Sequence, residues 1–438
     1  MLDTLLDAIS RELLSSSELQ RRLGVSQPTV SRLIRRAGDR VIRIGRGRAT
    51  RYAAAREVFG HGLSVPLLAV GETGVIDEIA TLRSLANGEY FVDPEAGDFW
   101  LRGAAGSGRF RSLPYFLDDL RPSGFLGRRI ARRLRRDWGF PGDPREWSDR
   151  ETGEYLLRRG TDLPGNLVLG DAADRVHAED PYTVTDRETA YPALAREVLG
   201  EGIPGSSAAG EQPKFCVYLP DAGHVIVKFS PSGEGPEASR WRDLILAEHH
   251  ALETLREHGV RAADATLHGF SGRAFLESRR FDRCGARGRR PAVSLAMVDA
   301  EFAGEGRSWS RVARELRKLG LLDPGSEREM LWAETFGAWI GNTDMHLGNV
   351  TLAPLGDRFE LLPLYDMLPM ILAPVRGELT PNRPATPVRT VASRDTWAEA
   401  GRAAATYWEG LAEDVRLTPE FRRIAGEETR RCLHDAGA

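Results

Sequence analysis

The sequence predicts an α+β protein in which a small N-terminal domain of helices and a hairpin precedes a larger body of two lobes. Three observations lead to this prediction: helical spacing of apolar residues near the N-terminus, β-type runs bounded by turns in the second half, and helical patterns near the C-terminus. A chain of 438 residues is longer than one ordinary core, so two or three folding units are expected. A hydrophobic fraction of 41% and a charged fraction of 28% are typical of a globular protein.

The N-terminal segment is expected to form a winged helix-turn-helix domain. Apolar residues first recur at helical spacing, and Ser15 with Glu18 then offers a capping box for a second helix. A third helix is expected over residues 27–37. Residues 41–44 and 49–52 flank a turn rich in glycine and arginine and are typical of a β-hairpin.

This domain, residues 1–60, is basic and is expected to bind duplex DNA. It holds twelve arginines against six acidic residues, which indicates a contact with a polyanion. A protein-docking role is the alternative, but phosphate contacts supply most non-specific DNA affinity, so the arginine-rich hairpin favours DNA. The candidate DNA contacts lie on the third helix and the hairpin and are Gln27, Thr29, Arg32, Arg36, Arg43, Arg46 and Arg48.

Three further domains are expected along the chain. Residues 61–200 mix short apolar pieces with glycine-rich stretches and predict only an α+β subdomain. Residues 201–285 are expected to form a lobe of strands, and residues 286–438 a mainly helical lobe.

The expected strand lobe brings together three candidates for binding a nucleotide. The glycine-flanked loop before its first strand, expected at 214–219, contains small residues that let backbone N–H groups approach phosphate. Lys228, at the end of the next strand, is expected to hold the phosphates of ATP. Glu248 lies on a helix expected over about 239–258 and is the expected ion-pair partner of that lysine. The loop residues that we expect to cover the phosphates are Ser206, Ser207, Ala208, Ala209 and Gly210.

The helical lobe contains the most specific pattern in the chain. Asp344 is followed five residues later by Asn349, the spacing of the protein-kinase catalytic loop, in which the aspartate accepts a hydroxyl proton and the asparagine binds Mg²⁺. This loop follows a helix expected over residues 327–340. Asp366 comes after the next expected hairpin and would supply the second oxygen ligand, which suits Mg²⁺. The order of these residues predicts a bilobal protein-kinase-like fold that uses ATP and Mg²⁺. His346 is not required by phosphoryl transfer and is expected to hold the loop.

Several segments resemble the HipA family of bacterial kinase toxins, in its YjjJ type with a fused helix-turn-helix. The resemblance implies that Lys228, Asn349 and Asp366 hold ATP and Mg²⁺, that Asp344 is catalytic, and that Ser207 is autophosphorylated. It also implies a protein substrate among translation components, notably an aminoacyl-tRNA synthetase, and restraint by a separate antitoxin. The segments that carry it are residues 119–124, residues 207–214, the Arg280-Phe281-Asp282-Arg283 run, the loop from Asp344 to Asn349, and the Tyr365-Asp366 pair.

Two other functions stay open at this point. The loop at Asp344 also resembles that of aminoglycoside and choline kinases, which would make this a small-molecule phosphotransferase, although the serine-bearing loop and the N-terminal domain count against it. A DNA-binding regulator whose kinase-like part senses a ligand is the non-enzymatic interpretation, and intact Asp344, Asn349 and Asp366 count against that.

The sequence predicts a cytoplasmic protein with no membrane partner. The three cysteines are widely spaced and form no metal-binding pair, and the N-terminus lacks the pattern of a signal peptide. No apolar run approaches the ~20 residues that span a bilayer.

Overall fold

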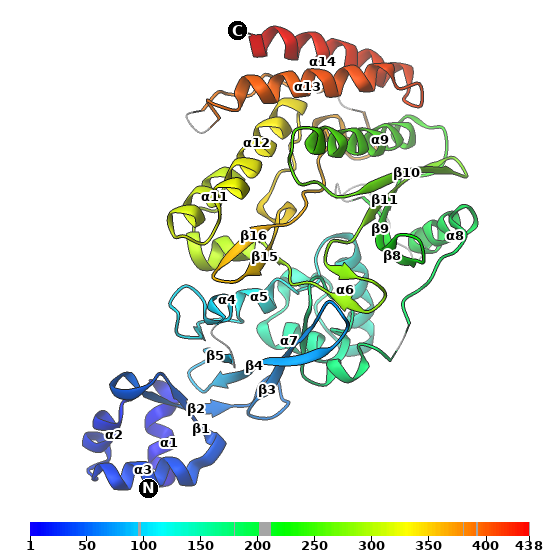
Figure 1. The fold of residues 1–438 in the computed structure, drawn as a ribbon. Helices are drawn as coiled ribbons and strands as arrows, with labels where there is room; N and C mark the ends of the chain where they lie inside the picture. Colours follow the sequence, from blue (N-terminus) through cyan, green and yellow to red (C-terminus); the bar gives the residue numbers. More distant parts are fainter. Residues whose placement is uncertain (95–97, 179, 201–211, 380, 391–392, 438) are drawn as a thin grey trace. The chain divides into compact units, whose positions relative to one another are not determined.

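The computed structural model describes residues 1–94, 98–178, 180–200, 212–379, 381–390 and 393–437. Contacts group the chain into two compact units, each assembled from separate stretches of sequence. The first unit comprises residues 1–121 and 146–179, and the second comprises residues 122–145 and 180–438. Figure 1 shows the elements of both units, coloured along the sequence.

The first unit opens with helices and a hairpin in the order predicted. The capping box is present, because Ser15 N donates to Glu18 Oε2 at 2.7 Å and Glu18 N donates to Ser15 Oγ at 3.3 Å. The second strand of the hairpin begins later than predicted, since Gly47–Ala49 forms a short 3₁₀ turn. The elements are α1 (Leu2–Arg11), α2 (Ser16–Leu23), α3 (Gln27–Ala37), β1 (Val41–Ile44) and β2 (Arg51–Arg56).

The rest of the first unit is built on an antiparallel sheet that the hairpin joins. The sheet has the order β1-β2-β4-β3-β7, with β5 pairing both β4 and β6, so the mixture of helix and strand expected here is confirmed. The strands are β3 (Val65–Val70), β4 (Ile76–Leu85), β5 (Tyr90–Pro94), β6 (Arg109–Phe110) and β7 (Leu167–Leu169). The helices are α4 (Phe99–Arg102), α5 (Tyr115–Asp118) and α7 (Asp149–Arg159).

The second unit contains a sheet in the order β10-β11-β9-β8 with helices on both faces (Figure 1). Alternate residues of β9, Val225, Val227 and Phe229, are buried with side chains of α6 and α8. The residues between them face α9. The elements are α6 (Gly124–Trp138), α8 (Arg187–Gly200), β8 (Lys214–Leu219), β9 (Gly223–Phe229), α9 (Pro236–Glu257), β10 (Ala265–Phe270) and β11 (Arg273–Arg279).

Short strands and longer helices complete the second unit. The strands are β12 (Arg283–Cys284), β13 (Gly288–Arg289), β14 (Val293–Ser294), β15 (Thr351–Leu355) and β16 (Arg358–Leu361). The helices are α10 (Leu295–Val298), α11 (Trp309–Lys318), α12 (Pro324–Ile340), α13 (Trp397–Glu413) and α14 (Pro419–Gly437). None of the described helices combines the length and apolar character that crossing a membrane needs.

Helix α9 begins about three residues earlier than predicted. Two further boundaries, both in elements that flank the loop of Asp344, differ from the prediction for local reasons. Helix α12 starts at Pro324, because Asp323 caps it by accepting from Gly325 N at 2.8 Å and from Ser326 N at 3.0 Å. The hairpin before Asp366 was expected to turn over residues 354–357, but its first strand keeps Pro354 and turns only at Gly356, whose φ of 61° suits a tight turn.

Candidate functional site

Lys228 lies at the centre of a buried ion-pair cluster in the second unit. It is 7% exposed and, because it alternates with the core residues of β9, it points to the side of the sheet that α9 covers. Its Nζ lies 2.5 Å from Glu248 Oε1 on α9 and also contacts Asp366 Oδ1. The structure therefore brings these three predicted residues together.

The electrostatics of the cluster favour the charged lysine and the charged aspartate. Burial alone would lower the pKa of Lys228, but the carboxylates of Asp366 and Glu248 outweigh burial and raise it. Burial alone would raise the pKa of Asp366, but the ammonium groups of Lys228 and Lys214 lower it to about 2. Burial raises the pKa of Glu248, whose second oxygen, Oε2, is buried without a hydrogen-bond partner among the described residues.

The loop after α12 is fixed by hydrogen bonds that join three of its polar residues to Asp366. Asn342, 4% exposed, donates from Nδ2 to the Asp366 carbonyl at 3.1 Å and accepts from Asp344 N at 3.2 Å. Asn349 donates from Nδ2 to the Asp344 carbonyl at 3.2 Å. Asp344, Asn349 and Asp366 thus belong to one network, with the Asp344 side chain exposed at its edge.

Asp366 adopts a backbone conformation that is uncommon for an aspartate. Its φ is 58°, in the left-handed region, where a residue with a Cβ is strained and where functional sites often place one. The preceding Tyr365 is held by hydrogen bonds, as its hydroxyl donates to the Gly348 carbonyl at 3.1 Å, and by stacking on Phe281 at 6.0 Å between ring centroids. The neighbouring Asp282 is paired with Arg280 at 2.9 Å, so the predicted motif from Arg280 to Arg283 supports the site next to this aromatic pair.

His346 holds the loop, as expected. Its Nδ1 accepts from Gly348 N at 3.1 Å, and its carbonyl accepts from Asn349 N at 3.0 Å. The same carbonyl accepts from the indole Nε1 of buried Trp309 at 3.0 Å. A core tryptophan on α11 therefore also positions the loop.

Two residues of the cluster were missed by the reasoning from sequence. Asn342 was overlooked because its partner, Asp366, lies 24 residues further along the chain. Lys214 was overlooked as well, although it lies directly opposite Lys228 on β8 and so projects from the same face of the sheet. A compositional signal could have found it, since only three of the 60 lysine and arginine residues are lysines: Lys214, Lys228 and Lys318.

The donor set suits a metal ion that is shared with a ligand. Asn349 and Asp366 offer an amide oxygen and a carboxylate, and no described residue donates a hydrogen bond to the Asn349 side-chain oxygen. Among the described residues, no group of three or more histidine, cysteine, aspartate or glutamate side chains could hold a metal alone. Mg²⁺ takes few carboxylates and completes its shell with phosphate and water, so these two oxygens fit it.

The loop residues expected to cover phosphate, Ser206, Ser207, Ala208, Ala209 and Gly210, lie outside the described residues. Gln212 and Lys214, which follow them in the same motif, are half-buried.

In the first unit, six of the seven candidate DNA contacts are exposed residues of α3 and the hairpin. Thr29 differs, because it is half-buried and its Oγ1 lies 3.2 Å from Ser26 Oγ. Within the described chain, no carboxylate lies at ion-pair distance from the five arginines of this set. The exposed side chains are Gln27, Arg32, Arg36, Arg43, Arg46 and Arg48.

Comparisons with known proteins match nearly the whole chain. The family described as YjjJ-like toxin, middle domain, matches residues 61–177, and the family described as HipA-like C-terminal domain matches residues 206–435. Toxin YjjJ of Escherichia coli strain K12 is 37% identical over 425 residues, which cover 94% of this chain and 93% of that protein.

Solved structures give a more distant likeness. A chain in the complex of HipA, HipB and operator DNA from Shewanella oneidensis MR-1 is 16% identical, with a TM-score of 0.62 over 85% of this chain and 96% of that chain. This match shows a shared fold. The proinflammatory kinase CtkA of Helicobacter pylori is 12% identical, with a TM-score of 0.35 over 51% of this chain and 90% of that chain, a likeness that supports no inference.

Proposed function

This chain belongs to the YjjJ-like branch of the HipA-like toxin family, and on that premise we propose that it is an ATP- and Mg²⁺-dependent protein kinase acting on serine or threonine. The observation that carries the proposal is the cluster of Lys228, Glu248 and Asp366, joined through Asn342 to the loop of Asp344 and Asn349. Phosphoryl transfer needs positioned charges more than covalent chemistry, and this network supplies them.

Each residue of the cluster has a role that follows from its contacts. Lys228, held by Glu248, is placed to pair with the phosphates of ATP, and Lys214 adds a second positive charge on the same face of the sheet. Asn349 and Asp366 would hold Mg²⁺. When bound, this ion would neutralise part of the phosphate charge.

Asp344 is the proposed base for the incoming hydroxyl. Its backbone is fixed on both sides by Asn342 and Asn349, while its side chain is exposed where a substrate can reach it. A carboxylate fixed in this way can orient a serine or threonine hydroxyl and accept its proton. The family resemblance favours a translation component, such as an aminoacyl-tRNA synthetase, as the protein that carries this hydroxyl.

The Asp366→Asn variant tests the proposed metal and nucleotide site. We expect Mg²⁺-dependent ATP affinity to fall by about 100-fold or more, because the variant loses the only carboxylate of the proposed metal pair. The matched control is Asp357→Asn, since Asp357 is exposed in the turn of the same hairpin. Isothermal titration with ATP, with and without Mg²⁺, provides the measurement. Unchanged affinity in a folded Asp366→Asn protein would show that Asp366 is not the ligand.

The proposal also covers an autophosphorylation site, a protein partner and a cellular compartment. Ser207 is the proposed autophosphorylation site, because the serine-bearing loop resembles that of the family. A phosphate of about -1.5 to -2 charges there would repel ATP and lower activity. A separate antitoxin is the proposed partner, and the solved complex that contains HipA and HipB supports this. The cytoplasm is the proposed compartment, and Cys216, Cys284 and Cys432 form no disulfide in the described chain.

A second proposed function is DNA binding by α3 and the β1–β2 hairpin. The support is the exposed set of arginines without carboxylate partners in the described chain. Such side chains are available to phosphates, which dominate non-specific affinity. The operator DNA in the complex of the distant HipA structure is consistent with this proposal.

Replacing Arg32, Arg36, Arg46 and Arg48 with alanine in the full chain tests the DNA proposal. We expect the slope of log affinity against log salt to become shallower by about 0.9 for each phosphate that the variant no longer neutralises. The control removes the same charge from α6, where Arg132, Arg133, Arg135 and Arg136 are also exposed. Equal decreases in affinity for both variants, measured by fluorescence anisotropy, would show that general basic charge binds DNA rather than this surface.

A further inference from the structure

Helix α9 carries Glu248 on one face and contacts the C-terminal helices with another. Asp243, Ala247 and His250 follow the spacing i, i+4 and i+7, so they share one side of the helix. Glu248 projects from the neighbouring side toward Lys228. Any contact that fixes the side of α9 with Asp243, Ala247 and His250 therefore also sets the rotation of the helix and the position of Glu248.

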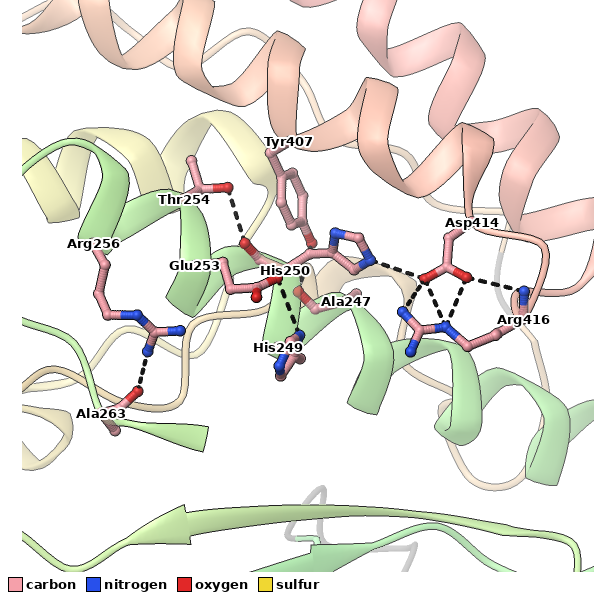
Figure 2. A network of polar contacts seen from close by, with 10 residues as sticks. All are labelled: Ala247, His249, His250, Glu253, Thr254, Arg256, Ala263, Tyr407, Asp414 and Arg416. Carbon is pink, nitrogen blue, oxygen red and sulfur yellow. Dashed lines mark hydrogen bonds and ion pairs between the residues drawn. The ribbon is translucent and has the colours of Figure 1, made fainter. Parts of the chain in front are cut away.

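The connector between α13 and α14 makes two polar contacts with this face. Asp414 Oδ2 lies 2.9 Å from His250 Nε2. Figure 2 shows these two side chains in contact. Thr418, at the start of α14, donates from its backbone N to Asp243 Oδ1 at 2.9 Å and from Oγ1 to Asp243 Oδ2 at 2.6 Å. Asp243 is 2% exposed, so both of these bonds are shielded from water.

Further hydrogen bonds fix the connector and join α13 to α9. Arg416 donates three side-chain hydrogen bonds to Asp414, at 2.9, 3.2 and 2.6 Å, and its backbone N donates a fourth at 3.0 Å, which fixes the carboxylate beside His250 (Figure 2). On α13, the buried Tyr407 donates its hydroxyl to the carbonyl of Ala247, the residue before Glu248, at 3.3 Å. These contacts together span the middle of α9.

The position of Glu248 must be held by other contacts, because burial of its carboxylate is energetically unfavourable. Its carboxylate is 1% exposed, and Oε2 has no hydrogen-bond partner among the described residues. A small rotation of α9 would let this oxygen reach water, and it would also separate Oε1 from Lys228. The packed apolar side chains of α9 resist such a rotation, and polar contacts add a directional restraint to that packing.

We propose that the α13–α14 connector is a clamp that holds α9 in the rotation at which Glu248 meets Lys228, with Asp414 and Thr418 as positioning residues. The proposal rests on the proposed kinase function for its effect on activity. Its effect on α9 itself is independent of that function. The clamp also gives this protein a route by which contacts at the C-terminal helices alter the nucleotide site.

Two double variants separate the clamp from general stability. Asp414→Ala with Thr418→Val removes the carboxylate that meets His250 and the hydroxyl that meets Asp243, and leaves only the backbone N of residue 418 as a donor to Asp243. Asp414→Asn with Thr418→Ser keeps an acceptor for His250 and a hydroxyl for Asp243. Arg423→Ala is the matched control on α14, because it removes an ion pair with Glu427 that does not involve α9. All variants are studied as full chains at a temperature where circular dichroism shows them folded.

Hydrogen exchange and kinetics then test the two parts of the clamp. We expect the removal variant to exchange the amides of residues 243–250 about tenfold faster and to lose about tenfold in kcat/KM for ATP. The conservative variant and Arg423→Ala should behave like the wild type. In a Glu248→Gln background, the removal variant should cause little further loss in kcat/KM, because both changes act on one ion pair.

Three outcomes decide the matter. Unchanged exchange in α9 overturns the clamp whatever the activity. An equal further loss in the Glu248→Gln background also overturns it, because the connector would then act by another route. Faster exchange in α9, together with a wild type that transfers no phosphate, supports the hold on α9 while the proposed kinase function fails.

Discussion

Among single residues, the two lysines of the buried site occupy the least expected positions. Lys214 and Lys228 lie directly opposite each other on β8 and β9, a placement of like charges that destabilises a sheet. Asp366 and Glu248 offset part of the repulsion, and both feel the charge of Lys214. An anionic ligand at this face would offset the rest, which is consistent with binding of a phosphate tail.

The Lys214→Met variant tests this interpretation. We expect KM for ATP to rise about tenfold, since the variant cannot form a charge-assisted hydrogen bond to phosphate, while the free energy of unfolding stays equal or increases slightly. Lys318→Met is the control, because Lys318 is the remaining lysine and pairs with Glu315 at 2.7 Å on an exposed surface of α11. Steady-state kinetics and urea unfolding provide both values. An unchanged KM would mean that Lys214 does not meet the nucleotide.

Elements with strong local signals were predicted well from the sequence. Helix α3 and strand β8 have the expected residues, because helical spacing, strand alternation and turns all lie within a few positions. The start of α12 was predicted three residues too late, because the helix is capped at Asp323. Contacts between residues far apart in the sequence were harder to predict. The pairings of Lys214 with Lys228 and of Asn342 with Asp366 depend on strand register and loop closure, which local patterns do not specify.

The polar contacts between α8 and β11 predict how the stability of the fold depends on pH. Glu277 on β11 is 6% exposed, accepts from Tyr191 Oη at 2.5 Å and pairs with Arg187 at 2.8 Å. Burial alone would raise the pKa of Glu277, but His268, Arg187 and Tyr191 outweigh burial and lower it to about 2. Because the folded pKa lies below the unfolded value, this stabilisation is present above about pH 4.5 and is lost as the pH falls toward 2.

The Glu277→Gln variant isolates that contribution. We expect it to lower the free energy of unfolding at pH 7 by roughly 2–3 kcal/mol and to flatten the decline of stability between pH 5 and pH 3. Urea unfolding at pH 7, 5 and 3, compared with the wild type, measures both effects. A variant that loses stability on acidification as steeply as the wild type would show that other carboxylates control this range.

Across the complete chain, the grouping of segments into units could not be predicted from the sequence. Helix α6 belongs to the second unit, although the chain on both sides of residues 122–145 belongs to the first. Phe125 enters the core formed by Phe215, Val227 and Phe275, and these contacts span 90 residues or more of sequence. By contrast, the order of Lys228, Glu248, Asp344, Asn349 and Asp366 was enough to predict that they belong to one network, because phosphotransferases of the kinase type share that order.

The most direct test of the kinase proposal compares the wild type with Asp344→Asn in one experiment on the full chain. Both proteins are incubated with Mg²⁺ and ATP, ATP affinity is measured, and phosphosites are mapped by mass spectrometry. We predict phosphate on serine or threonine, including Ser207, in the wild type, and a decrease of at least about 100-fold in Asp344→Asn with ATP affinity retained. Phosphorylation that persists in Asp344→Asn would contradict the catalytic assignment, and transfer to aminoglycosides or choline but to no protein would contradict the protein-kinase function itself.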